Sequence, residues 1–254
     1  MADSTPRLFK RWDIHQRIQH FMLVAAMIVL MMTGLPLRYP DVVTSRFIVM
    51  LIGGIDNAGI VHRCAAVTMM LATLYHIIYL IVRWRQGNLR LTMLPAWKDV
   101  QDVIGMLLFL VGLSRTKPKF ARYGFKEKSE YWAMLWGSIV MMGTGLMLWF
   151  PTKAALIFHS YSPIAFDVTR IIHSYEALLA FLAIIIWHLY NAHLTPEFFP
   201  MSWTWLNGTI TEDQLKAEHA LEYEEIIERE RSPRSTAPPK TKPARARSRA
   251  ERHR

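Results

Sequence analysis

Five histidines lie within, or at the start of, long apolar segments of this chain. These residues are His20, His62, His76, His173 and His188. An ionisable side chain in such a segment is costly and is therefore a candidate for function. His62 and His76 are fourteen residues apart, about 21 Å along a helix. His173 and His188 are fifteen residues apart, about 22 Å. Each pair stays within about 60° of one helix face. Two such spans can therefore offer imidazoles to two cofactors at two depths.

The spacing of the histidines favours heme over other metal cofactors. A neutral imidazole ligates heme iron, zinc or copper. Zinc and copper sites require three or four ligands close together, whereas these histidines are separated and the one carboxylate near them is Glu176. Cys64 is the single cysteine, which excludes Cys-rich clusters and covalent heme attachment. Heme needs one axial ligand per face, so the pattern predicts two non-covalent b hemes. The alternative is histidines hydrogen-bonded among the helices.

The segments that carry these histidines predict an all-α integral membrane protein. Hydrophobic residues make up 52% of the 254 residues. A membrane-spanning helix needs about 20 mainly apolar residues. Four segments meet this requirement: 17–37, 61–82, 131–151 and 171–191. A soluble helical bundle is disfavoured, because four nearly uncharged segments exceed what so short a chain could shield from water. We therefore predict a four-transmembrane-helix bundle that contacts membrane lipid.

The distribution of Lys and Arg predicts the orientation. Basic residues are frequent before the first span, between the second and third spans, and after residue 195. The other two loops hold only Arg38, Arg46, Arg63, Lys153 and Arg170. Basic loops remain on the cytoplasmic side. This bias places both termini and the segment between the second and third spans in the cytoplasm.

The remaining segments divide the chain into three parts. Residues 1–207 hold the spans, with an interfacial helix expected near 98–113, whose apolar run is too short to cross the bilayer. Residues 208–231 predict a polar cytoplasmic helix, with Thr211 as its cap. Residues 232–254 predict a disordered basic tail. A solvated or lipid-contacting tail is favoured over one that binds nucleic acid.

A weak internal repeat and several short motifs carry a family resemblance. The first span ends with Thr33-Gly34-Leu35, and the third ends with Thr144-Gly145-Leu146. The other motifs are Arg17-Ile18-Gln19-His20, Val61-His62-Arg63, Lys128-Ser129-Glu130-Tyr131-Trp132, Ile172-His173-Ser174 and Trp187-His188-Leu189-Tyr190. Over about residues 11–205 the sequence resembles the membrane cytochrome b subunits of NiFe hydrogenases and the gamma subunits of respiratory formate dehydrogenases. It resembles still more the bacterial cytochrome b proteins associated with multiheme c-type cytochromes.

The resemblance implies which histidines share a heme. His20 would pair with His188 towards the cytoplasm, and His62 with His173 towards the outer face. The family separates its two fourth-span histidines by fourteen residues, whereas this chain separates them by fifteen. His76 is an additional histidine, which could replace His20 as ligand, form a third site, or carry protons near a quinone.

Other residues and partners follow from the same hypothesis. Arg17, Arg38 and Arg63 are placed to bind heme propionates, or to anchor the spans at the interface. The expected function is electron transfer between the quinone pool and a partner redox subunit, such as a multiheme cytochrome c, a dehydrogenase or an iron–sulfur protein. The chain would be a subunit of a respiratory complex rather than a stand-alone enzyme. The alternatives are a four-span proton-linked transporter and a membrane anchor without heme.

Overall fold

The computed structural model describes residues 6–159 and 162–232. Within them, four helices are long and apolar enough to cross a membrane. They are α1 (Ile14–Arg38), α3 (Ile55–Arg85), α5 (Phe125–Trp149) and the span Pro163–Leu194. The last span comprises α7 (Pro163–Leu182) followed by two π-helical segments, η1 (Ala183–His188) and η2 (Tyr190–Leu194). All four predicted spans are confirmed as helices, and each extends beyond one or both predicted ends.

Local sequence signals explain where several of these helices begin. Asp13 caps α1, accepting a hydrogen bond from the amide of Gln16, whose side chain in turn accepts one from the amide of Asp13. Gly53 and Gly54 both have positive φ, and they separate α3 from the short helix before it. Ser162 caps α7, with Pro163 in the first helical turn. Each of these spans therefore begins next to a residue that suits a helix cap or a turn.

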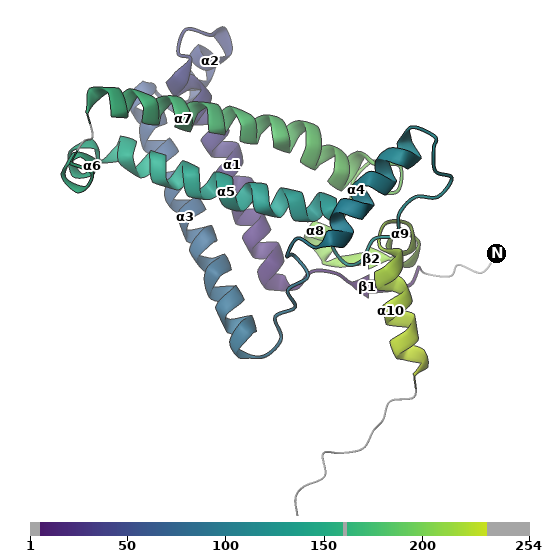
Figure 1. Cartoon of the computed structure of the whole chain (residues 1–254). Helices are drawn as coiled ribbons and strands as arrows, with labels where there is room; N and C mark the ends of the chain where they lie inside the picture. The colour runs from purple at the N-terminus through teal and green to yellow at the C-terminus, as the bar shows by residue number, and fades with distance from the viewer. Residues whose placement is uncertain (1–5, 160–161, 233–254) are drawn as a thin grey trace, which may run out of the picture.

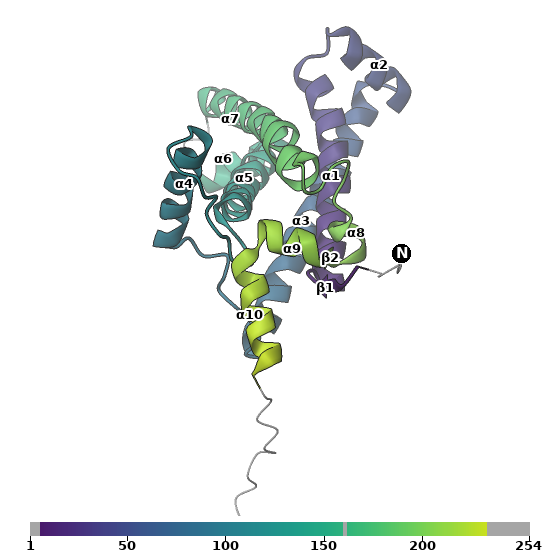
Figure 2. The ribbon, with the colours of Figure 1, turned by 90° about the vertical axis from the view of Figure 1, so that its right-hand side faces the viewer.

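The spans form two helix pairs. Helix α1 packs along α3, and α5 packs along α7, while α1 and α7 contact over a shorter stretch. Figures 1 and 2 show that the two pairs cross instead of lying side by side as a regular bundle. Many apolar side chains on the spans face outward, among them Ile28, Leu71, Ile139 and Ile186. Outward apolar side chains suit helices surrounded by lipid.

Short helices occupy the connections between the spans. Helix α2 (Val43–Ile52) follows the first span, and α6 (Pro151–Ile157) follows the third. Neither was expected from the sequence. Helix α4 (Trp97–Leu110) forms where an interfacial helix was expected. It is held to α5 by an ion pair in which Nζ of Lys128 is 2.8 Å from the Asp99 carboxylate.

The C-terminal segment forms a small cap together with the N-terminal arm. Strand β1 (Leu8–Lys10) pairs antiparallel with β2 (Thr209–Thr211), with Leu8 opposite Thr211. Three short helices complete the cap: α8 (Thr204–Asn207), α9 (Glu212–Glu218) and α10 (Ala220–Arg231). Phe9, Ile210 and Leu215 form its apolar core. Where one polar helix was expected over 208–231, the structure has β2 followed by the two helices α9 and α10, and Thr211 caps α9. The basic tail expected at 232–254 lies, except for Ser232, outside the described residues.

A buried charge network joins the cap to the connector before α5. The guanidinium of Arg11 donates to the carboxylate of Glu222 and to the carbonyl of Arg122. Arg122 donates in turn to Glu222, at 2.6 Å, and to the carbonyl of Arg11. His219 donates from Nδ1 to the carbonyl of Ala121, at 3.0 Å. Burial and the adjacent Arg11 lower the pKa of His219 to about 3. The arm, the connector and the C-terminal segment are thus held as one unit, because each charge has a partner.

Candidate functional site: two histidine pairs

The structure brings four of the candidate histidines together as two pairs. His20 on α1 and His188 in η1 have ring centroids 6.2 Å apart. His62 on α3 and His173 on α7 have ring centroids 6.5 Å apart. All four rings are partly buried. These are the pairings that the family resemblance implied, and each pair joins one helix pair to the other.

The separation within each pair matches what one metal between two imidazoles requires. A metal–imidazole bond is about 2.0 Å long and the ring centre lies about 1.1 Å beyond the nitrogen, so two axial imidazoles have centroids roughly 6.2 Å apart. The observed 6.2 and 6.5 Å agree with this geometry. Within residues 6–159 and 162–232, no group of three or more His, Cys, Asp or Glu side chains could hold a metal ion. The histidines meet as pairs, which is the arrangement of axial heme ligands.

The two histidines of the second pair are oriented by equivalent contacts. The Thr33 hydroxyl lies 2.9 Å from Nδ1 of His62, and the Thr144 hydroxyl lies 2.8 Å from Nδ1 of His173. A hydrogen bond at Nδ1 fixes the ring and leaves Nε2 available to a metal. The glycine after each threonine permits this approach, because a Cβ on Gly34 would lie 3.1 Å from Cε1 of His62. A Cβ on Gly145 would lie 3.3 Å from Cε1 of His173.

The first pair has a different set of partners. Nδ1 of His188 lies 2.8 Å from Oε2 of Glu130 on α5. Carboxylate–histidine contacts are common behind metal-bound imidazoles, where they raise the basicity of the ligand. His20 instead packs against the rings of Trp12 and Trp205, at centroid distances of 5.2 and 5.8 Å. The Thr33, Thr144, Glu130 and Trp205 contacts were missed in the sequence, although the repeated Thr-Gly motif was visible.

A π-helical segment lies between His173 and His188, which are fifteen residues apart. Hydrogen bonds in a π-helix run from residue i to i+5, so each turn holds more residues than an α-helical turn. The segment η1, Ala183–His188, ends on the histidine itself. The segment lies between His173 and His188, where a wider turn can accommodate one additional residue. Short π segments are frequent at functional sites.

Unpaired buried polar atoms gather around the first pair. Six buried side-chain nitrogen or oxygen atoms have no hydrogen-bond partner among the described residues. They belong to Arg17, Gln19, His20, His193, Thr195 and Trp205, all within 17–20 or 193–205. An unsatisfied buried polar atom costs about 1–3 kcal/mol. Such a concentration fits residues that bind a polar group carried by a cofactor, as the propionates of heme are.

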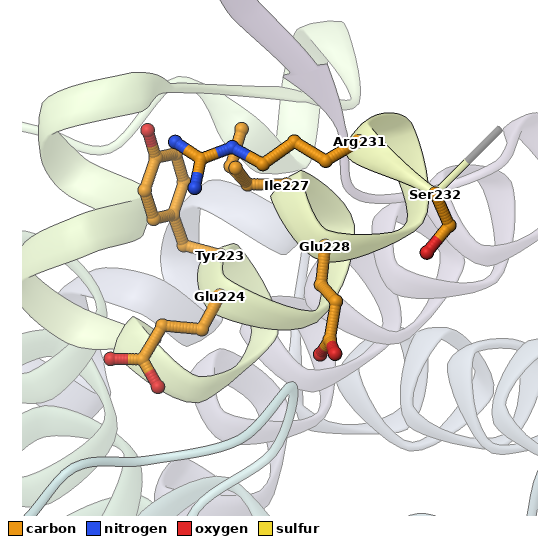
Figure 3. A pocket seen from close by; sticks show the side chains of 6 residues that line it. All are labelled: Tyr223, Glu224, Ile227, Glu228, Arg231 and Ser232. Carbon is orange, nitrogen blue, oxygen red and sulfur yellow. The ribbon is translucent and has the colours of Figure 1, made fainter.

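The other candidate residues belong to neither pair. His76 contacts Gln19 and Tyr131. Arg38 and Arg63 are exposed, and their guanidinium carbons lie over the rings of Tyr39 and Trp149 at 5.1 and 5.9 Å. A hollow of about 700 Å³ lies along α10, and Figure 3 shows the side chains that line it. Its lining residues, Tyr223 to Ser232, all come from this helix and its end. The hollow is a surface feature of the cap and holds none of the paired histidines.

Comparison with known proteins decides the family. Residues 11–203 match the prokaryotic cytochrome b561 family. The chain belongs to this family. It is therefore a multi-pass membrane cytochrome of the b type, and the family implies heme b and a role in electron transfer.

Individual relatives agree with this assignment. The "Formate dehydrogenase, cytochrome b556 subunit" of Haemophilus influenzae is 23% identical over 176 residues, which cover 69% of this chain and 67% of the relative. The "Formate dehydrogenase, cytochrome b556(fdo) subunit" of Escherichia coli K12 is 21% identical over 178 residues, covering 66% of this chain and 78% of the relative. The resemblance to bacterial membrane cytochromes b of the formate dehydrogenase type is thereby confirmed.

Proposed function

We propose that this cytochrome binds two b hemes and carries electrons across the bacterial inner membrane. His62 and His173 would ligate one iron, and His20 and His188 the other. The observation that supports this most is the presence of two separate histidine pairs, with ring centroids 6.2 and 6.5 Å apart. When bound, heme alternates between ferric and ferrous iron and so accepts and passes single electrons. The protein supplies ligands, burial and hydrogen bonds that set the potential.

Each residue around the pairs has a specific role in this proposal. Thr33 and Thr144 hold the rings of His62 and His173 at Nδ1 and would leave Nε2 of each ring for an iron. Glu130 does the same for His188. Arg17, His193 and Trp205 would donate hydrogen bonds to the propionates of the inner heme, because each has a buried unpaired nitrogen beside His20 or His188. This supports the propionate-binding role expected of Arg17 and adds His193 and Trp205 to that site.

The orientation and the partners complete the proposal. We place both termini in the cytoplasm, because the basic residues concentrate in the arm, the middle segment and the C-terminal segment. The inner heme is then the His20–His188 heme, and the outer heme is the His62–His173 heme. The relatives are named as formate dehydrogenase subunits. By analogy this chain would exchange electrons between quinone and a dehydrogenase, an iron–sulfur protein or a multiheme cytochrome c.

The decisive experiment is the visible spectrum and heme content of the purified protein. We expect sharp b-type bands after dithionite reduction, and two hemes per chain by pyridine hemochrome. A preparation with a folded, membrane-inserted chain but no heme would contradict the proposal. That result would favour a transporter or a non-heme anchor. One heme per chain would retain the cytochrome and reject the second site.

A further inference from the structure

A third polar cluster lies beside the inner pair and includes none of the proposed ligands. His76 on α3 has both ring nitrogens in contact with polar partners. Its Nδ1 lies 2.9 Å from Oε1 of Gln19 on α1, and its Nε2 lies 3.1 Å from the hydroxyl of Tyr131 on α5. With both nitrogens engaged, His76 has none free to ligate iron. An ionisable residue within a membrane span still requires a role.

The partners of His76 suit the charged form of the ring as well as the neutral form. An amide oxygen only accepts hydrogen bonds, so Nδ1 carries the hydrogen and donates to Gln19. Nε2 then accepts from the Tyr131 hydroxyl. If Nε2 takes up a proton, the hydroxyl oxygen can accept in its turn, because tyrosine both donates and accepts. His76 can therefore gain or lose a proton without losing a hydrogen bond.

Both partners of His76 are next to residues of the inner pair. Gln19 directly precedes His20, and Tyr131 directly follows Glu130, which contacts His188. His76 thus joins the two helices that hold and orient this pair. A change of charge at the pair acts strongly on such a group, because charges in a protein interior are screened far less than in water.

A row of polar contacts leads from His76 towards the start of α1. One helical turn before Gln19, Nδ1 of His15 lies 2.8 Å from the hydroxyl of Tyr75, which precedes His76. Further on, the hydroxyl of Tyr79 donates to the carboxylate of Asp13, at 2.7 Å. His15 is exposed. This end of the α1–α3 contact is therefore the side from which a proton would reach His76 from water.

We propose that His76 is a redox-linked proton acceptor, an inference that rests on the proposed heme at His20 and His188. When one electron arrives at that pair, His76 takes up one proton on Nε2 from the aqueous side at the start of α1. It releases this proton when the electron leaves. One electron and one proton are exchanged: an N–H bond forms at Nε2 as an O–H bond of hydronium breaks, and the reverse occurs on release.

The surroundings single out His76 among the titratable groups. The groups on facing helices are Asp13, His15 and His20 on α1, and Glu130 and Tyr131 on α5. Its own helix adds Tyr75, Tyr79 and Arg83. Burial raises the pKa of Asp13, but hydrogen bonds from Gln16 and Tyr79 outweigh it and hold this pKa below its ordinary value. Asp13 therefore stays ionised near neutral pH. His20 is a proposed ligand and His15 lies at the exposed end of the row, so His76 is the partly buried imidazole of this cluster that has no ligand role.

The test is the midpoint potential of each heme, measured by spectroelectrochemistry on the intact protein between pH 5.5 and 8.5. A tenfold change in proton activity shifts a one-electron couple by up to about 59 mV when one proton is taken up. In the wild type we expect the inner-heme potential to fall with rising pH over part of this range. His76→Gln keeps a donor and an acceptor but cannot titrate, so it should retain both hemes and flatten this dependence.

Two further variants make the experiment decisive. His15→Gln, at the exposed histidine of the same row, should keep the pH dependence and slow only proton exchange. Tyr131→Phe should keep the dependence but move it to lower pH, because the imidazolium loses its acceptor. An unchanged slope in His76→Gln, no slope in the wild type, or a slope lost only in His15→Gln would each overturn the inference. Loss of a heme in His76→Gln would do so too. Failure of the proposed function would instead appear as missing heme in the wild type.

Discussion

The hydroxyl of Thr33 faces Nδ1 of His62 across the α1–α3 contact, at 2.9 Å. The same relationship recurs between Thr144 and His173 across α5 and α7, at 2.8 Å, and both pairs are 29 residues apart in sequence. The internal repeat of Thr-Gly motifs therefore has a structural counterpart. Each half of the protein uses one helix to orient a histidine on the next, and the two oriented histidines then meet.

Removing this hydroxyl should weaken the outer heme selectively. Thr33→Val or Thr144→Val keeps the side-chain volume but leaves Nδ1 of the facing histidine without its partner. Loss of such a partner typically costs 10–100-fold in metal affinity. We expect faster loss of one heme in dilution or apomyoglobin-transfer assays, with the other heme unchanged. Thr68→Val is a matched control, since its hydroxyl bonds only to the carbonyl of Cys64 in its own helix. Equal loss of heme in Thr33→Val, Thr144→Val and Thr68→Val would argue against a role of Thr33 and Thr144 in orienting the histidines.

Substitution of either histidine in the outer pair should remove the same heme. His62→Ala and His173→Ala each delete one axial ligand, and the rings are 6.5 Å apart between centroids. A redox titration should then show one remaining component with the same potential in both variants. If each variant lost a different component, the pairing would be wrong.

Retention of the inner heme should require His20 as a ligand and should not require His76. His20 lies 6.2 Å from His188 between ring centroids, whereas both nitrogens of His76 already contact Gln19 and Tyr131. We expect the low-spin heme signal to lose one component in His20→Ala and to keep both in His76→Ala. Retention of both hemes in His20→Ala, together with loss of one in His76→Ala, would reverse the assignment.

The unpaired donors beside His20 should tune the inner heme. Arg17→Gln removes a positive charge and Trp205→Phe removes a donor, so both should favour the ferric form and lower its potential. The effect of one such hydrogen bond is about 1 kcal/mol, or about 40 mV for a one-electron couple. Arg38→Gln, at an exposed arginine over Tyr39, is the control. A larger shift in Arg38→Gln than in the two others would remove Arg17 and Trp205 from the propionate site.

The cap should loosen in acid because of His219. Its pKa is lowered to about 3, by burial first and then by Arg11, whereas an unfolded histidine has a pKa of about 6.5. Between about pH 3 and pH 6.5, His219 is therefore protonated in the unfolded cap and neutral in the folded cap. The stability is complete above about pH 6.5 and decreases on acidification towards pH 3, by about 1.4 kcal/mol per unit.

Hydrogen exchange of the β1 and β2 amides measures this directly. Protection should fall with pH in the wild type and much less in His219→Gln, which can still donate to the carbonyl of Ala121 and accept from Arg11. His159→Asn changes an exposed histidine outside the cap and should behave as the wild type. Equal acid sensitivity in His219→Gln would show that other groups control the cap.

The amino-acid sequence alone was enough to predict the spans and the candidate ligands. Long uncharged segments can bury their backbone polar groups only as helices in lipid. An imidazole in such a segment costs free energy, so a histidine there is a candidate functional residue wherever it occurs. The cap helix after Thr211 was predictable for a similarly local reason, since a capping box involves residues only three apart. The family motifs further implied which histidines pair.

Only the tertiary structure decided which atoms meet. Helical spacing along α3 left His76 as plausible a ligand as His20. Spacing indicates the depth of a residue in the membrane and its face on its own helix, but it does not show which residue of another helix lies opposite. The structure places Gln19 and Tyr131 on the two nitrogens of His76 and places His188 opposite His20. The strand pairing of Leu8 with Thr211 and the Arg11–Glu222 ion pair were equally beyond local pattern. Both join segments some 200 residues apart, and such contacts depend on how the whole chain folds back on itself.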